Sequence, residues 1–282
     1  MRSLIVTDTT STISIKEAND AGIILIPLNI IIDNQSYLDC YEMDNNKLGD
    51  CLREKLLPTT SQPNIKLIVD ELEKHHAKDY DHVYILTISS GLSGTYQSFK
   101  IAIDELKLTN VTLVDTKTVC CTIRNMVFKV CSLVNNGYSH EEIIHSIDEQ
   151  IKQQYSFLYP SDLSQLKKGG RISPMAYQLA SLLKIKPLLY LNDDGNSIEK
   201  YAVCKTEKKI ISTIVNKIKA LGMDNDQYML YVAHSETQEN AESFTNKLML
   251  ELNIQDYQII PITSVLMCHA GFGAYAIQII KK

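Results

Sequence analysis

Residues 82–106 read HVYILTISSGLSGTYQSFKIAIDEL, an apolar run followed by a polar loop and a second stretch with apolar periodicity. The first part, HVYILTI, predicts a buried strand, and FKIAIDEL (residues 99–106) predicts a helix. The loop between them, SSGLSGTYQS (residues 89–98), contains four serines, one threonine and two glycines. A strand that leads through a short polar loop into a helix is the repeating unit of a parallel α/β sheet.

The same alternation of strands and helices extends through the first half of the chain. Further strands are expected at residues 3–8, 22–33 and 110–116, and helices at residues 46–56, 64–74 and 119–137. These strands are continuous apolar runs, which is typical of a parallel sheet covered by helices on both faces. Gly137 is expected to close the last of the helices.

The second half of the chain follows a different pattern. Gly169-Gly170 is expected to end a short helix, and Ser173-Pro174 to begin the next one as its N-cap and first helical residue. Two strand-like arms around Asp194-Gly195 indicate a β-hairpin. Helices are then expected at residues 207–221 and 238–252, and strands at residues 228–234 and 257–264.

The length of 282 residues suits one large domain or two smaller ones. We place a boundary within residues 153–162, which include Pro160, and predict domains at residues 1–156 and 157–282. Hydrophobic residues make up 45% of the chain and charged residues 22%, which are ordinary values for a globular protein.

Charge and composition disfavour several classes of partner. The net charge of -5 and the pI near 5.8 disfavour nucleic acid, whose binding proteins carry a basic face. No apolar run reaches the roughly 18 residues of a membrane span, and the N-terminal sequence lacks a signal-peptide pattern, so we expect a cytoplasmic protein. The seven cysteines are expected to be reduced, and the seven histidines lack metal-ligand spacing, so we predict no metal and no cofactor.

Polar side chains gather where the predicted parallel strands end. Three clusters, Asp8–Ser11, Ser89–Thr95 and Asp115–Thr118, each follow a strand. A fourth, Thr59–Pro63, opens a helix, with Pro63 expected at the first helical position. In open α/β sheets ligands bind outside the carboxyl ends of the strands, where helix N-termini also point. The clusters together predict a ligand site, although any one hydroxyl is equally expected as a helix cap.

The loop SSGLSGTYQS differs from the familiar phosphate-binding and nucleophile loops. A phosphate loop needs a lysine directly after its second glycine, but Gly91 and Gly94 are three residues apart and no lysine follows them in the loop. Gly91 and Ser93 begin a G-x-S-x-G nucleophile elbow, yet Thr95 stands where the second glycine is needed. Hydroxyls and backbone N–H groups with little formal charge suit a singly charged anion. His269, expected in a glycine-flanked loop after a strand, is a further candidate for ligand contact.

Five motifs give the chain a resemblance to a known family. TTSQPN, SSGLSGTYQS, LVDTKT, LKKGGRIS and the His-Ala-Gly-Phe-Gly near the C-terminus occur in the order and approximate spacing of the DegV family of fatty-acid-binding proteins. The resemblance extends from Ser3 to Ile280. It implies a Rossmann-like parallel-sheet N-terminal domain and a C-terminal α/β domain with a largely antiparallel sheet. One long-chain fatty acid of the palmitate or oleate class is implied to bind between them, its acyl chain covered by the C-terminal domain.

The resemblance also implies a role and a set of site residues. Bacterial members are carriers and not enzymes: they present the carboxylate to a separate fatty-acid kinase subunit, which makes an acyl phosphate from ATP. The expected interactions include a transient contact with a membrane surface for lipid exchange. Arg171, with its neighbours Lys167 and Lys168, is implied to face the kinase. The residues implied to bind the carboxylate are Thr60, Ser61, Ser93, Gly94 and His269.

Two other functions are consistent with the residue types. The first is an acyl hydrolase or transferase that uses Ser93 as its nucleophile. Its base is expected to be His269 or His234, and Asp8 or Asp115 is expected to orient that base. The second is a small phosphosugar or nucleotide binder, which the low density of lysine and arginine in the loops disfavours.

Overall fold

The computed structural model describes residues 2–54, 56–161, 163–181, 185–223, 227–235, 237–252 and 254–282. The chain divides into two compact units. The first unit contains Met1–Ile151 and Thr263–Cys268, and the second contains Lys152–Ile262 and His269–Lys282. Both units combine helices with β-sheets, which confirms the predicted α/β fold class.

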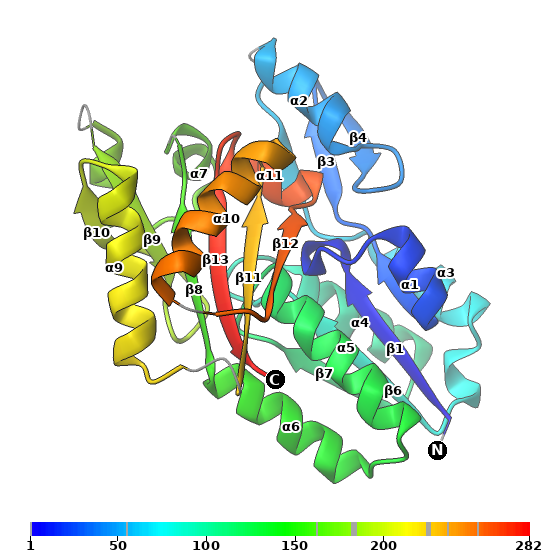
Figure 1. Ribbon diagram of the computed structural model, residues 1–282. Coiled ribbons are helices and arrows are strands. Elements are labelled where there is room, and N and C mark those ends of the chain that lie inside the picture. Colours follow the sequence, from blue (N-terminus) through cyan, green and yellow to red (C-terminus); the bar gives the residue numbers. More distant parts are fainter. Residues whose placement is uncertain are drawn as a thin grey trace. The chain divides into compact units, whose positions relative to one another are not determined.

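A four-stranded parallel sheet in the order β2-β1-β6-β7 forms the centre of the first unit (Figure 1). Its strands are β1 Ser3–Asp8, β2 Ile23–Ile26, β6 His82–Thr87 and β7 Val111–Asp115. One face packs against α3 (Ile65–Lys74) and α4 (Thr95–Leu106), and α5 (Cys121–Asn135) contacts β1 and β6. Because successive strand residues face opposite sides, covering both faces requires the continuous apolar runs seen in the sequence. The predicted parallel sheet is confirmed.

The apolar run at residues 22–33 forms two strands that belong to different sheets. β2 ends at Ile26, Pro27 follows, and β3 (Asn29–Ile32) pairs antiparallel with β4 (Gln35–Leu38) and β5 (Thr59–Ser61). Proline lacks the N–H that a strand interior needs, so it interrupts the run. Thr60 and Ser61 therefore lie on β5, a strand that ends three residues before Asn64, the N-cap of α3.

Capping residues explain where α3 begins and where α5 ends in the first unit. Asn64 caps α3 by accepting a hydrogen bond from Lys66 N at 2.9 Å. Pro63 precedes this cap, so its predicted place at the first helical position is wrong; the asparagine side chain is the stronger start signal. α5 ends shortly before Gly137, which has φ +77° and confirms the predicted stop. The other α-helices that begin in this part of the chain are α1 Ile15–Ala21, α2 Asn45–Arg53 and α6 His140–Lys152.

Six strands in the order β10-β9-β8-β13-β11-β12 form the sheet of the second unit. Every neighbouring pair is antiparallel except β11–β12, so the largely antiparallel sheet is confirmed. The predicted hairpin around Asp194-Gly195 joins β9 to β10. The strands are β8 Gln154–Tyr159, β9 Lys186–Leu191, β10 Ile198–Cys204, β11 Tyr228–His234, β12 Tyr257–Pro261 and β13 Tyr275–Lys281.

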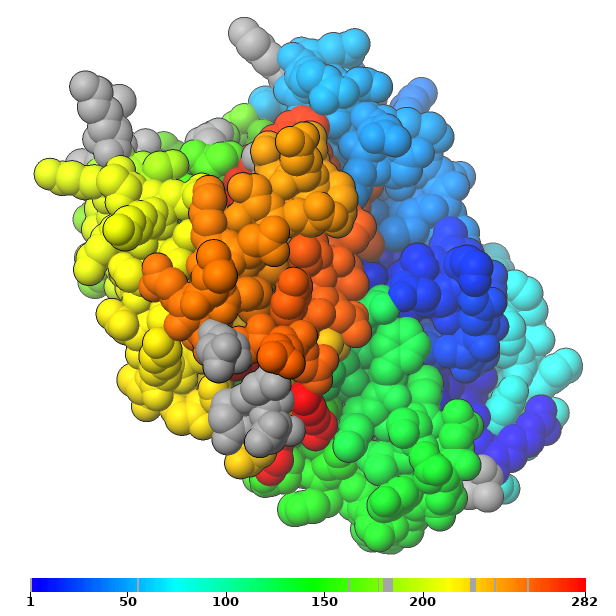
Figure 2. All heavy atoms as spheres, viewed as in Figure 1, coloured from blue at the N-terminus to red at the C-terminus, as the bar shows by residue number. Residues whose placement is uncertain are grey.

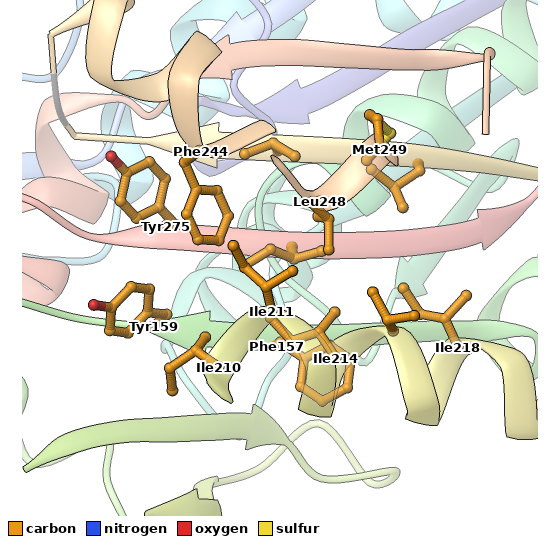
Figure 3. Close-up of a cluster of buried hydrophobic side chains, with 14 of the residues drawn as sticks. Phe157, Tyr159, Ile210, Ile211, Ile214, Ile218, Phe244, Leu248, Met249 and Tyr275 are labelled. Atoms are coloured by element: carbon orange, nitrogen blue, oxygen red, sulfur yellow. The ribbon is translucent and has the colours of Figure 1, made fainter. Parts of the chain in front are cut away.

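Two long helices, α9 (Glu207–Ala220) and α10 (Gln238–Leu252), pack on this sheet (Figure 1). They contact each other, and their surfaces are adjacent in Figure 2. Their apolar side chains, among them Ile214 and Phe244, pack with those of the sheet in one buried cluster (Figure 3). α7 (Ser164–Gly169) ends at the left-handed Gly170, and α8 (Pro174–Tyr177) begins with Ser173 as its cap, as predicted. The predicted continuation of α8 becomes a 3-10 turn at Gln178–Ser181, and residues 182–184 lie outside the described residues.

The predicted domain boundary after residue 156 stays a prediction. That residue lies inside β8, which pairs with β9 and β13 of the second sheet. Asp162, the last residue of the predicted boundary segment, lies outside the described residues.

A short segment near the C-terminus, Thr263–Cys268, belongs to the first unit and forms most of α11 (Ser264–Ala270). Val265 N donates a hydrogen bond to Asp39 Oδ1 at 3.1 Å. Thr263 Oγ1 donates to the carbonyl of Thr9 at 3.1 Å, and Ser264 Oγ donates to Asn45 Oδ1 at 2.9 Å. Hydrogen bonds to residues more than 200 positions earlier in the chain therefore hold this segment to the rest of the first unit.

Candidate ligand site

Asp8 joins two of the polar loops at the carboxyl edge of the parallel sheet. Its Oδ2 accepts a hydrogen bond from Ile88 N at 2.9 Å, and its Oδ1 accepts from the N and Oγ1 of Thr10. The side chain is fully buried, and this burial raises the pKa of Asp8 although the hydrogen bonds oppose the rise. Because Ile88 directly precedes SSGLSGTYQS, the loops after β1 and β6 lie together, as the sequence predicts.

Asp115 joins the loop after β6 to the loop after β7. Its carboxylate accepts hydrogen bonds from Ser90 N at 3.1 Å, from Ser90 Oγ, and from Lys117 Nζ at 2.7 Å. Burial opposes ionisation of Asp115, but the hydrogen bonds from Lys117 and Ser90 outweigh it and lower its pKa. Neither Asp8 nor Asp115 accepts a hydrogen bond from a histidine in the part of the chain that the structure describes. Both carboxylates instead hold loops in place, whereas in the alternative hydrolase one of them would have to orient the histidine base.

Ser93 lies at the turn that leads into α4, with its side chain half-buried. Its Oγ accepts a hydrogen bond from Thr95 N at 3.3 Å and lies 2.8 Å from Thr95 Oγ1. A hydroxyl has two acceptor lone pairs and one proton, so Ser93 can accept both contacts and keep its proton for a ligand. The adjacent Gly94 is the N-cap of α4, where first-turn N–H groups favour an anion.

Gln62 connects the TTSQPN segment to the SSGLSGTYQS loop within the first unit. A Cβ atom on Gly94 would lie 1.7 Å from Gln62 Oε1, so a larger residue here would have to displace the Gln62 amide. Asn29 Nδ2 fixes the Gln62 backbone by donating to its carbonyl at 2.9 Å. Thr60 and Ser61, both half-buried, directly precede Gln62. Two motifs that are thirty residues apart in sequence therefore meet, and Gln62 and Asn29 are contacts that sequence reasoning missed.

Two more hydroxyls stand out because they are buried and lack a hydrogen-bond partner among the described residues. Ser11 Oγ lies in the turn after β1, and Ser98 Oγ lies in the first half of α4. A buried hydroxyl without a partner costs on the order of 1–3 kcal/mol, and a ligand that supplied the missing hydrogen bond would remove that cost. Ser11 belongs to the predicted Asp8–Ser11 cluster, and Ser98 is the last residue of the SSGLSGTYQS loop, but neither is among the residues that the resemblance implies for carboxylate binding.

His269 and the KKGGR motif lie together in the second unit. A Cβ atom on Gly169 would lie 2.3 Å from His269 Nδ1, so the imidazole packs directly on the glycine backbone. Arg171 Nη1 donates a hydrogen bond to the carbonyl of the same glycine. Burial and, second, the nearby Arg171 guanidinium lower the pKa of His269 to about 4. The imidazole is therefore neutral near pH 7 and offers a hydrogen bond without a charge.

The expected place of His269 in a glycine-flanked loop is wrong, because it lies in the last turn of α11. Asp39 accepts the hydrogen bond of the first-turn N–H of Val265, and this distant contact supports a helix that the sequence does not signal. Gly271, with φ +74°, follows the helix.

The predicted site residues divide between the two units. Thr60, Ser61, Ser93 and Gly94 belong to the first, and His269 and Arg171 belong to the second. Lys167 and Lys168 lie in the last turn of α7, where the helix dipole favours cations. His234 of the alternative enzyme lies at the end of β11, also in the second unit.

The described residues include no group of three or more histidine, cysteine, aspartate or glutamate side chains arranged to hold a metal ion. Among the described residues, no helix combines the length and the apolar character that crossing a membrane requires. All seven cysteines are free thiols, and Cys120, Cys121, Cys204 and Cys268 are buried.

Comparisons with known proteins agree over the whole chain. A family model described as "Uncharacterised protein, DegV family" matches residues 2–282. A DegV domain-containing protein of Streptococcus pyogenes serotype M3 is 30% identical over 287 residues, covering 100% of both chains.

Two solved structures are similar in both sequence and fold. A DegV family protein from Thermus thermophilus, described for its fatty acid binding, has a TM-score of 0.90 and 26% identity, with 100% of both chains covered. A fatty acid binding DegV family protein from Streptococcus agalactiae has a TM-score of 0.89 and 30% identity, covering 100% of this chain and 99% of that one.

Proposed function

Because this chain belongs to the DegV family, we propose that it is a non-catalytic carrier that binds one long-chain fatty acid. Its relatives from Thermus thermophilus and Streptococcus agalactiae are described as fatty acid binding proteins, which supports the proposal. In this proposal the carrier works in the cytoplasm and presents the fatty-acid carboxylate to a separate kinase that forms an acyl phosphate. It exchanges its lipid through transient contact with a membrane surface.

The observation that supports this function best is the meeting of the TTSQPN and SSGLSGTYQS motifs at Gln62 and Gly94. That junction brings together hydroxyls and backbone N–H groups, and the nearby acids already have partners. A carboxylate needs hydrogen bonds wherever it leaves water, and uncharged donors can supply them. We propose Thr60, Ser61, Ser93 and Gly94 as the carboxylate-binding residues of the first unit. His269 as a further carboxylate contact and Arg171 as a kinase contact stay predictions from the family resemblance.

The affinity in this proposal comes from the acyl chain and not from the head group. Burying roughly fifteen methylene groups at about 0.8 kcal/mol each gives on the order of 12 kcal/mol before the costs of association. The head-group contacts then orient the carboxylate. Uncharged donors suit a carrier, since no buried counter-charge has to be separated when the carboxylate reacts with a kinase.

Lipid identification tests the binding directly. Organic extraction of the purified full chain, followed by mass spectrometry, is expected to release about one long-chain fatty acid per protein molecule. Adding oleate to delipidated protein at about 100 times its dissociation constant should stabilise the fold by about 2.7 kcal/mol. The methyl ester of oleate is the matched control, because it keeps the tail and removes the anionic head. No released lipid together with no thermal shift from oleate or palmitate rules the proposal out.

Kinase coupling is tested separately. The loaded carrier, a bacterial fatty-acid kinase and ATP are expected to yield an acyl phosphate, which hydroxylamine traps as a hydroxamate. The carrier alone with ATP should yield none. Hydroxamate formed by the carrier alone contradicts a non-catalytic role, and stoichiometric labelling of Ser93 by a fluorophosphonate favours a serine enzyme instead.

A further inference from the structure

The second unit contains a cavity of about 570 Å³ at one end of its sheet. The lining comes from the end of β8, the start of β9, the junction of β10 with α9, and the start of β13. The remaining wall is one face of α10, whose contributing residues follow the spacing i, i+3, i+4, i+7. These residues are Asn240, Ser243, Phe244 and Lys247.

Three lysines and one glutamate line this cavity, which leaves an excess of two positive charges (three minus one) in a chain whose net charge is -5. Lys186 Nζ donates a hydrogen bond to the hydroxyl of Tyr159 at 2.9 Å. Lys247 Nζ lies 2.9 Å from Glu207 Oε1. Lys205 forms no ion pair with any residue that the structure describes. Of the three lysines in the cavity, Lys186 is therefore bound to a tyrosine hydroxyl, Lys247 is paired with a carboxylate, and Lys205 has no ion-pair partner among the described residues.

The floor of the cavity is aromatic but presents polar edges. Tyr159, Phe244 and Tyr275 pack together, with the rings of Phe244 and Tyr275 stacked at a centroid distance of 4.3 Å. Figure 3 shows the hydroxyl oxygens of both tyrosines at the same end of this buried cluster. The three side chains are at most 7% exposed, so they offer no open ring face on which a base or another ring could stack.

We propose that this cavity binds a small phosphorylated metabolite through its phosphate group. A phosphate monoester carries a charge of about -1.5 to -2 at pH 7, which matches the excess of two positive charges. Lysine ammonium groups bind phosphate as point charges, and the tyrosine hydroxyls with Asn240 and Ser243 add hydrogen bonds. The volume lies within the range of small-molecule sites, about 300–1,000 Å³. A fatty acid is a poor occupant, since its tail would leave the ammonium groups without partners.

The Lys247–Glu207 pair does not block such a ligand. The two side chains are 56% and 37% exposed, and an exposed ion pair contributes little, about 0–1 kcal/mol. Lys247 can therefore exchange its carboxylate partner for a phosphate at small cost. This inference does not rest on the proposed fatty-acid function, because none of the cavity residues belongs to the proposed carboxylate site.

The test is binding to the full chain, measured by isothermal titration calorimetry at low ionic strength. The probes are adenosine monophosphate, glucose 6-phosphate, inorganic phosphate and, as a phosphate-free control, adenosine. Saturable binding of the three phosphates but not of adenosine is expected. Lys205→Met should raise the dissociation constants roughly tenfold. Lys219→Met is the matched control: it removes an exposed lysine of α9 that does not line the cavity and should change binding less than about twofold.

A second variant tests the cavity without removing a charge. Ser243 is exposed on α10, so Ser243→Phe should fill the space and abolish phosphate binding while thermal unfolding stays unchanged. The proposal is overturned if no phosphate probe binds saturably at millimolar concentration, or if adenosine binds as well as its monophosphate. It is also overturned if Lys219→Met weakens binding as much as Lys205→Met, or if folded Ser243→Phe binds phosphate normally.

Discussion

The polar edge of the first unit and the cavity of the second unit offer anions two different environments. At the edge, Ser93 and the start of α4 supply neutral donors, and the carboxylates of Asp8 and Asp115 are occupied by main-chain N–H groups and neighbouring side chains. In the cavity, three ammonium groups face one carboxylate. The first environment suits an anion that needs orientation, and the second suits one whose charge supplies the binding energy.

The difference also separates charges that hold the fold from charges that are available to a ligand. Buried charged groups need partners, because desolvation without compensation costs several kcal/mol. Asp8 has such partners and is fully buried. Lys205 is exposed and has no ion-pair partner among the described residues, so its removal should leave the fold intact.

Asp8→Ala is expected to lower the free energy of unfolding by about 4 kcal/mol. The change leaves the buried N–H groups of Thr10 and Ile88 without their acceptor, and each such loss costs about 1–3 kcal/mol. Urea denaturation followed by circular dichroism measures the effect. Asp8→Asn keeps one acceptor oxygen and should lose about half as much. The unfolding free energy of Lys205→Met should stay within about 0.5 kcal/mol of the wild type. An equal loss of unfolding free energy in Lys205→Met and Asp8→Ala would contradict the distinction between charges that stabilise the fold and charges that are available to a ligand.

Acid is expected to destabilise the surroundings of His269. Its pKa is about 4 in the folded chain and near 6.5 when unfolded, so the unfolded chain binds more protons between these values. The contribution of His269 is therefore present above pH 6.5 and falls as the pH falls toward 4, by up to about 3 kcal/mol. Burial raises the pKa of Asp39 to about 7, which acts in the opposite direction over much of this window.

A comparison with His269→Gln isolates the histidine from Asp39. The difference in unfolding free energy between the wild type and His269→Gln should shrink or reverse as the pH is lowered from 6.5 to 4, measured by urea denaturation at each pH. A difference that is constant over this range means that His269 is not held neutral by its surroundings.

The double change Thr60→Ala and Ser93→Ala is expected to weaken oleate binding about thirtyfold, or about 2 kcal/mol, because both proposed hydroxyl donors are lost. The unfolding free energy should change little, since both side chains are only half-buried. Ser132→Ala, an exposed serine on α5, is the control and should bind oleate normally. Unchanged oleate affinity in the double variant excludes these hydroxyls as the main head-group contacts.

Gly94→Ala is expected to weaken oleate binding about fivefold, or about 1 kcal/mol, because the new methyl group must displace the Gln62 amide. Adding Gln62→Ala removes the obstruction and should restore most of the affinity. Fluorescence competition with a labelled fatty acid measures both variants. If the second change fails to restore binding, the effect of Gly94→Ala arises from the backbone and not from Gln62.

Local patterns predicted most of the secondary structure correctly. The parallel sheet of the first unit has continuous apolar strands, and the hairpin at Asp194-Gly195 has a two-residue turn signal. Ser173-Pro174 begins α8 as expected, since a capping side chain and a fixed proline φ act within one turn. These features depend on neighbours in sequence, which is why a single sequence suffices to predict them.

Some errors had local causes, as where Asn64 and not Pro63 begins α3, and others occurred where a distant contact determines the structure. Pro27 separates β2 from β3, and the second of these strands pairs with residues 59–61. His269 lies on a helix because Asp39, 226 positions before Val265, accepts the first-turn hydrogen bond. The approach of Gln62 to Gly94 joins two loops thirty residues apart, and no local pattern signals such a contact.

The attachment of Thr263–Cys268 to the first unit means that the chain passes between the units at three places. A single proteolytic cut near residue 152 consequently leaves the fragment 152–282 carrying a piece of the other unit's structure. In the separated fragments, Val265 N would lose its acceptor on Asp39. The Thr9 carbonyl and the Asn45 side chain of the first unit would lose their hydrogen-bond donors. Split-gene expression should therefore give two fragments that reassociate when mixed and that are poorly folded when kept apart.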